Sequence, residues 1–135
     1  MVSRVGPGSG PPPPAPGEED SWLYRYRARV VSVYDGDTCT VEIDLGIEVW
    51  AHGEKLRLAR INAPEVRGSE RPAGLAARDW LRARIDGKEV VLHTWRDRKG
   101  KYGRYLAEIW LADGNGWVNI NDAIVAAGHA EYHDY

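Results

Sequence analysis

Short alternating segments are the feature of this sequence that most limits its possible folds. Residues 22–34 alternate apolar and polar side chains and end at the turn sequence DGDT. Alternation returns in residues 39–45 and 54–61, and residues 87–95 and 104–114 have the composition of two further strands. Successive side chains of a strand point to opposite faces of a sheet, so these patterns fit half-buried strands. The chain is therefore expected to be mainly β.

Two segments have helical rather than strand spacing. Residues 72–85 begin with a proline, which suits a first helical turn, and carry apolar residues at helical intervals. Residues 119–127 favour a short helix that Gly128 would end. The predicted order is three strands, a helix, two strands and a helix. This is the order of an α+β OB-fold, a five-stranded barrel with two packed helices.

The first 20 residues differ in composition from the rest of the chain. They include the run VGPGSGPPPPAPGEED, which is rich in proline and glycine and ends in acids. Such a segment cannot bury enough apolar surface to offset the entropy lost on ordering. We expect residues 1–20 to form a flexible tail or linker and residues 21–135 to form one domain.

The sequence offers little for a membrane, a disulfide or a structural zinc site. It has no apolar run of about 18 residues and no apolar core of a secretory signal near residue 1. One cysteine, Cys39, and four histidines make a structural zinc site improbable. No membrane partner is expected, and an intracellular protein is the plainer interpretation.

Positive charge is concentrated in one segment. The net charge of the chain is only −2, but RDRKGKYGR at residues 96–104 carries five basic side chains against one acid. A basic loop on an otherwise neutral domain can meet phosphate groups locally. A solvated hairpin loop would have the same composition, and charge alone leaves both interpretations open.

The first turn contains an unexpected second acid. DGDT places Asp35 and Asp37 at the predicted hairpin between the first two strands. An isolated Asp-Gly pair is most simply a turn. Asp37, however, stands at the start of a strand, where acids are depleted. That position makes Asp37 a candidate functional residue.

A second set of polar groups follows the third strand. Pro64 disfavours helix at Ala63, so the chain is extended or turning there. The Asp37 carboxylate, the Asn62 amide oxygen and the Ala63 carbonyl are hard oxygen donors, which suit Ca²⁺ or Mg²⁺. Glu65 lies just past the proline. By itself this set could equally form a structural cation site or a surface cluster of ion pairs.

Two arginines extend the candidate chemistry. Arg57 lies on the third predicted strand, and Arg104 follows the basic segment. A divalent cation, two arginines and a carboxylate such as Glu65 are what phosphodiester hydrolysis requires. The cations stabilise charge that develops on the phosphate, and the carboxylate activates or orients a water molecule.

The motifs DGDT, RLARINAPE and KYGR, in this order, resemble the staphylococcal nuclease, or thermonuclease-like, family over residues 29–130. The resemblance implies an OB-type barrel that cleaves DNA and RNA with Ca²⁺. It also implies that Asp37 is a metal ligand and that Arg57, Glu65 and Arg104 are catalytic. The Lys-Tyr pair before the second arginine implies substrate-phosphate contacts at Lys101 and Tyr102.

The sequence departs from the family pattern at the predicted metal site. Asn62 stands where the family usually has a second aspartate, and Ala63 replaces a threonine that contributes its backbone carbonyl. Calcium affinity depends on the number of charged ligands, so we expect weaker Ca²⁺ binding or use of another divalent cation such as Mg²⁺ or Mn²⁺.

The leading hypothesis is a nuclease, and the alternative is a nucleic-acid-binding OB module without catalysis. The joint presence of Arg57, Glu65 and Arg104 favours the enzyme. We expect a monomer that acts on DNA or RNA, preferentially in single-stranded or frayed regions. Trp50 and Trp95 are candidates for stacking on bases, although filling the core is the simpler role.

Overall fold

The computed structural model describes residues 24–96 and 104–133. The predicted tail at residues 1–20 lies outside this part of the chain, as do the predicted phosphate contacts Lys101 and Tyr102. Within the described residues, no helix is both long enough and apolar enough to cross a membrane.

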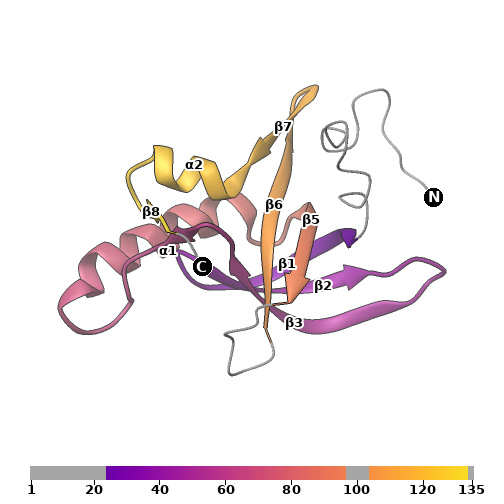
Figure 1. Ribbon diagram of the computed structural model, residues 1–135, viewed down its shortest axis with the longest axis horizontal. Coiled ribbons are helices and arrows are strands. Elements are labelled where there is room, and N and C mark those ends of the chain that lie inside the picture. The colour runs from indigo at the N-terminus through magenta and orange to yellow at the C-terminus, as the bar shows by residue number, and fades with distance from the viewer. Residues whose placement is uncertain (1–23, 97–103, 134–135) are drawn as a thin grey trace.

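Five strands form a closed barrel, and two helices pack on it (Figure 1). The sheet order is β3-β2-β1-β5-β6, and a parallel pairing of β3 with β6 closes the barrel. The predicted five-stranded OB-type barrel with two helices is confirmed. The barrel strands are β1 (Arg25–Asp35), β2 (Thr38–Asp44), β3 (Trp50–Leu58), β5 (Glu89–Arg96) and β6 (Tyr105–Asp113), and the helices are α1 (Arg71–Ile85) and α2 (Ile120–Ala126).

Short elements that the sequence did not predict complete the fold. They are β4 (Ile61–Asn62), β7 (Gly116–Asn119), β8 (Glu131–Tyr132) and a 3-10 turn, η2 (Gly68–Glu70). β7 extends the sheet beside β6, and β4 pairs with β8 in a separate two-stranded sheet.

The predicted strand over residues 54–61 is wrong at its end. β3 stops at Leu58, and the chain turns before β4 because Arg60 adopts a left-handed conformation with φ of 68°. The Arg60 guanidinium holds this turn by donating to both carboxylate oxygens of Glu108, at 2.6 and 2.8 Å, and to Asp122 at 3.0 Å. Both acids lie far along the chain, so local sequence could not indicate the turn.

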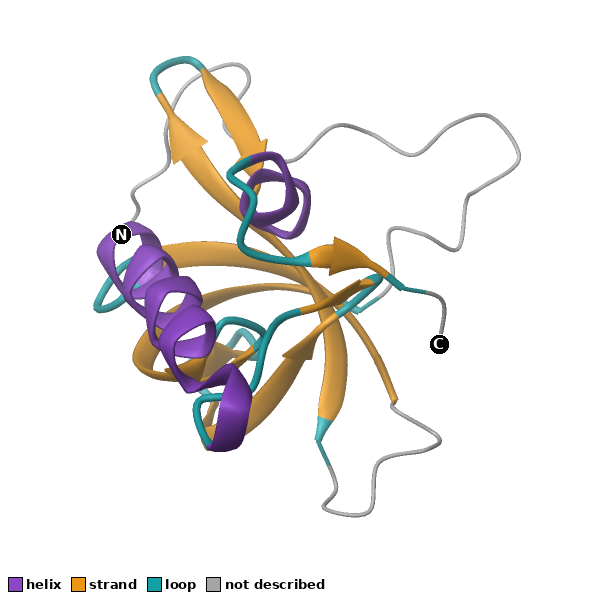
Figure 2. Cartoon of the chain, turned by 90° about the vertical axis from the view of Figure 1, so that its left-hand side faces the viewer, coloured by secondary structure: helices purple, strands orange, loops and turns teal. Residues whose placement is uncertain are grey.

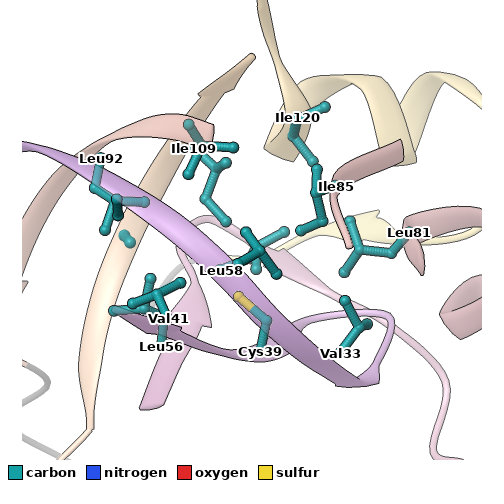
Figure 3. Packing of buried hydrophobic residues seen from close by; sticks show 14 of the residues in the cluster. Val33, Cys39, Val41, Leu56, Leu58, Leu81, Ile85, Leu92, Ile109 and Ile120 are labelled. Carbon is teal, nitrogen blue, oxygen red and sulfur yellow. The ribbon is translucent and has the colours of Figure 1, made fainter. Parts of the chain in front are cut away.

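The hydrophobic core fills the barrel and continues under α1. Figure 3 shows Leu56 and Leu58 of β3 among side chains from the other barrel strands, with Leu81 and Ile85 approaching from α1. All four of these side chains are fully buried. Each contributes about 1.5–3 kcal/mol through removal of apolar surface from water.

Helix α1 lies against one end of the barrel (Figure 2). The β1–β2 turn packs on it so closely that a Cβ atom added to Gly36 would lie 2.7 Å from the Ala77 Cβ. The connection between β2 and β3 extends away from α1 (Figure 1). The barrel therefore has an end covered by α1 and an opposite end that α1 does not cover.

Candidate active site

The β1–β2 turn brings Asp37 against the chain that follows β3. The Asp37 side chain is buried. Its Oδ2 atom accepts a hydrogen bond of 2.9 Å from the Ala63 N–H and lies 3.4 Å from Arg57 Nη2. Its Oδ1 atom accepts from the Thr38 hydroxyl at 3.2 Å. These contacts fix the orientation of the carboxylate.

Arg57 is buried at the end of β3 and is held by its own chain. Its Nη1 atom donates to the carbonyl of Leu58 at 2.9 Å and to that of Ile61 at 3.1 Å. Its Nη2 atom donates to Asn62 Oδ1 at 3.3 Å. The planar guanidinium is thus oriented by several acceptors at once.

Four predicted site residues therefore meet at one place. Asp37 comes from the first turn, Arg57 from β3, Asn62 from β4 and Ala63 from the position directly after β4. Arg57 Nη2 lies between the two side-chain oxygens predicted to bind metal, those of Asp37 and Asn62. Ala63 is buried, and its N–H contacts Asp37.

The other two described candidates lie at the margins of this group. Glu65 is exposed and belongs to the connection between β4 and α1. Arg104 is half-buried and directly precedes β6. The β3–β6 register places Leu106 beside Arg57, so Arg104 is two residues from the strand neighbour of Arg57.

Asp35 lies beside Asp37 in the candidate site, although the sequence did not single it out. Its buried side chain accepts a hydrogen bond of 3.0 Å from the Asp37 N–H. Burial, followed by repulsion from the Asp37 carboxylate, raises the pKa of Asp35 to about 7. The sequence signal for Asp35 is the pair of acids in DGDT, but an acid directly before glycine is most simply part of a turn.

The Asp35 pKa gives stability a specific pH dependence. Because the native-state pKa lies above 3.8, the native state holds a proton that the unfolded state releases between about pH 4 and pH 7. The free energy of unfolding therefore falls as the pH rises through this window.

Asp35→Asn keeps the acceptor for Asp37 N–H and removes the charge, so we expect it to stabilise the protein by about 1–3 kcal/mol at pH 8. Urea unfolding with a chelator at pH 4 and pH 8 checks this; an equal effect at both values would contradict it.

The donor set at this site suits a hard cation. Among the residues that the structure describes, no three His, Cys, Asp or Glu side chains form a cluster. The available donors are the carboxylates of Asp35 and Asp37 and the amide oxygen of Asn62. Two neighbouring buried carboxylates repel each other, as the Asp35 pKa reflects, and a divalent cation would relieve that repulsion. Oxygen donors without sulfur or imidazole fit Ca²⁺, Mg²⁺ or Mn²⁺.

Gly74 lets α1 approach the chain that carries Glu65. A Cβ atom at position 74 would lie 2.0 Å from the Glu65 carbonyl oxygen and 2.8 Å from the Val66 nitrogen. Both are backbone atoms, which cannot rotate away as a flexible side chain can. The close contact therefore determines where the Glu65 backbone lies relative to the helix.

Gly74→Ala is expected to destabilise the protein by about 1–3 kcal/mol, as overpacking does. The sign is diagnostic, because glycine-to-alanine changes inside helices usually stabilise by up to about 1 kcal/mol. Gly116→Ala is the matched control, since its added Cβ would meet nothing closer than 3.9 Å. Thermal unfolding of both variants measures the difference; a stabilised Gly74→Ala protein would refute the contact.

Comparison with known proteins relates this chain to one family, and the matched segment includes Arg57, Asn62, Ala63, Glu65 and Arg104. Residues 55–135 match the family model described as staphylococcal nuclease homologue. The chain is 33% identical to a thermonuclease of Staphylococcus intermedius, over 62% of this chain and 48% of that protein. It is 28% identical to an uncharacterized protein of Methanocaldococcus jannaschii, over 76% of this chain and 56% of that protein. The chain spans about half the length of the curated relatives it matches.

Proposed function

The chain belongs to the staphylococcal nuclease homologue family, and from this premise we propose that it is a divalent-cation-dependent nuclease that hydrolyses phosphodiester bonds of DNA, RNA or both. The observation that carries the proposal is the buried Arg57 guanidinium, which lies between the oxygens of Asp37 and Asn62. The name thermonuclease, carried by relatives about 30% identical to this chain, supports it.

Two arginines supply positive charge for the scissile phosphate. Arg57 is held by backbone carbonyls, so little reorganisation is needed when it meets an anion. Arg104, beside the start of β6, is the second guanidinium. Bidentate donors of this kind stabilise the additional negative charge that develops on phosphate oxygens during attack. Lys101 and Tyr102 are proposed to contact a neighbouring phosphate of the substrate.

Glu65 is proposed to orient or deprotonate the attacking water. Its side chain is exposed, so it can reach solvent and a bound strand. Its backbone is held against α1 at Gly74, so the carboxylate projects from a defined position. A positioned general base of this kind typically contributes a rate factor of about 10²–10⁴.

The proposed cation is Ca²⁺, or another divalent ion such as Mg²⁺ or Mn²⁺. Asp37, Asn62 and the Ala63 carbonyl would hold it, with Asp35 close by. When bound, it would polarise a phosphate oxygen as a Lewis acid. Asn62 brings one negative charge fewer than a carboxylate, which lowers the expected affinity.

Asn62→Asp is therefore expected to lower the Ca²⁺ concentration at half-maximal cleavage by about tenfold, or about 1.4 kcal/mol. The new carboxylate also pairs with Arg57 Nη2, the present donor to Asn62 Oδ1. A calcium titration of cleavage by both proteins is the measurement. Asn115→Asp, at an exposed asparagine in the turn between β6 and β7, is the control for a general change in charge. Equal half-saturation in wild type and Asn62→Asp would refute the role of Asn62.

The alternative is a nucleic-acid-binding module without catalysis. It is favoured by one observation: position 62 is an asparagine rather than an acid, so the candidate site offers a cation one carboxylate fewer. Incubation with single-stranded and duplex DNA and with RNA, in Ca²⁺, Mg²⁺, Mn²⁺ or chelator, separates the two functions. The nuclease proposal expects cleavage that a chelator abolishes and that is faster on single strands. Retention of nucleic acid on filters without cleavage in any ion would establish the alternative.

The enzyme is proposed to act as a monomer, because Asp37, Arg57 and Asn62 contact one another within one chain and need no second copy to meet. Sedimentation equilibrium at the concentration of the cleavage assay tests this directly. A single species of about 15.1 kDa is expected.

A further inference from the structure

The barrel end that α1 leaves uncovered contains an aromatic hollow. Its volume is about 540 Å³, and it lies among the starts of β1, β3 and β6 and the ends of β2 and β5. Tyr24, Tyr26, Trp95 and Tyr105 line it. The β3–β6 register puts Tyr105 beside Leu56, on the barrel side of the sheet, whereas Arg57 is the partner of Leu106. The hollow is therefore distinct from the candidate active site.

Several of these large rings are open to solvent. Tyr24 is 61% exposed, and Trp95 and Tyr105 are each 40% exposed. Trp95 also packs edge-on against His93, with ring centroids 5.6 Å apart. Trp95 and Tyr105 lie on neighbouring barrel strands, so their backbones are held by the sheet. A contiguous exposed aromatic surface of this kind indicates an interaction site.

The charge of the hollow disfavours nucleic acid as its occupant. Of the described residues that line it, only Glu54 is charged, and it is acidic. The rim carries both signs of charge, since Asp44 is the strand partner of Arg27 and Arg104 directly precedes Tyr105. Inside the hollow itself, a phosphate backbone would meet the negative charge of Glu54 and no positive charge among the described lining residues. An uncharged, apolar segment of chain would meet no electrostatic repulsion there.

We propose that the aromatic hollow docks residues 11–16 of the same chain, PPPPAP, as a polyproline II helix. Proline-rich segments bind grooves lined by tyrosine and tryptophan because their extended helix is preformed and loses little entropy on docking. Three residues complete one turn, so Pro11 and Pro14 share a face, as do Pro13 and Pro16. The proline carbonyls can accept hydrogen bonds from tyrosine hydroxyls or the Trp95 indole.

The tether is long enough for this docking. The described chain begins at Tyr24, which itself lines the hollow. Pro16 precedes Tyr24 by eight residues, which can span about 26–29 Å when extended. Gly17 gives the chain freedom to reverse direction. A short flexible tether also provides an effective concentration in the millimolar range, so weak contacts suffice.

Paramagnetic relaxation in the full chain tests the proposal. A nitroxide is attached at Ser9→Cys; Cys39 is buried and does not compete for the label. The indole N–H signal of Trp95, identified by its loss in Trp95→Phe, is expected to broaden strongly. In the matched variant with Pro11, Pro12, Pro13 and Pro14 replaced by serine, the tether length is unchanged but the preformed helix is lost. The relaxation enhancement at Trp95 is then expected to fall at least about threefold.

Three outcomes would overturn the proposal. Equal broadening with and without the four prolines means that the tail is only near the hollow. Broadening of a 15N-labelled, nitroxide-free chain when a nitroxide-labelled chain is added means that a second copy occupies it. A shift of the Trp95 signal with single-stranded DNA, but not with the proline replacements, means that the hollow binds bases. None of these outcomes depends on nuclease activity.

Discussion

Glu65→Gln is expected to lower the turnover rate of phosphodiester cleavage by about 10²–10⁴-fold while leaving the Michaelis constant nearly unchanged. Glutamine has the same shape as glutamate but cannot accept a proton at neutral pH. The Glu65 side chain is exposed, so its replacement costs little folding stability. The loss therefore reports on chemistry, provided that the proposed nuclease activity is present in the unaltered protein.

Glu89→Gln is the matched control for this experiment. Glu89 is an exposed glutamate at the start of β5, and its only described ion pair is a surface contact of 3.6 Å with Arg29. Such contacts contribute less than about 1 kcal/mol. Initial rates over a range of substrate concentrations separate turnover from binding. If Glu65→Gln and Glu89→Gln had the same turnover rate, Glu65 would have no role as a base.

The barrel could be predicted because each of its strands has a local pattern of apolar and polar residues. Alternation located β1 and β2, and Pro72 with helical spacing located α1 to within one residue at its start. The candidate site residues Asp37, Arg57 and Asn62 also stand in local motifs at strand ends, where the sequence makes them visible. Their mutual contacts follow from the barrel, since β2 pairs with β3 and sets Thr38 beside Arg57.

What the sequence could not indicate depends on partners far apart along the chain. The left-handed Arg60 is held by Glu108, 48 residues away, so the break between β3 and β4 has no local signal. The contact of Gly74 with the Glu65 backbone depends on how α1 packs. From sequence alone, a glycine inside a helix indicates only a lower helix propensity. Alternation placed Leu56 and Leu58 on one face of β3, but it did not indicate that Arg57 is buried as well, because both faces of the strand are covered there.

Asn121 has a structural role that the local sequence does not indicate. It lies in the first turn of α2, where asparagine is unremarkable, yet its side chain is fully buried. Its Nδ2 atom donates to the carbonyls of Ala59 and Ala107, each at 2.9 Å, and its Oδ1 accepts from the Ile109 N–H at 3.1 Å. One amide group thus joins α2 to β6 and to the turn after β3.

Asn121→Ala is expected to reduce the free energy of unfolding by about 3–5 kcal/mol. The Ala59 carbonyl and the Ile109 N–H lose their Asn121 partner inside the protein, which costs about 1–3 kcal/mol for each group, whereas the Ala107 carbonyl still accepts from the Ala59 N–H. The midpoint of thermal unfolding should fall by about 10–20 °C. Asn119→Ala, two residues earlier, is the control: it removes the helix cap on Asp122 N–H, which typically costs about 1 kcal/mol, and a part-buried hydrogen bond of 2.9 Å to Glu108. Since the turn after β3 leads directly to Asn62 and Ala63, loss of Asn121 should also loosen the proposed cation site. Equal destabilisation by the two alanine variants would show instead that Asn121 serves only its helix.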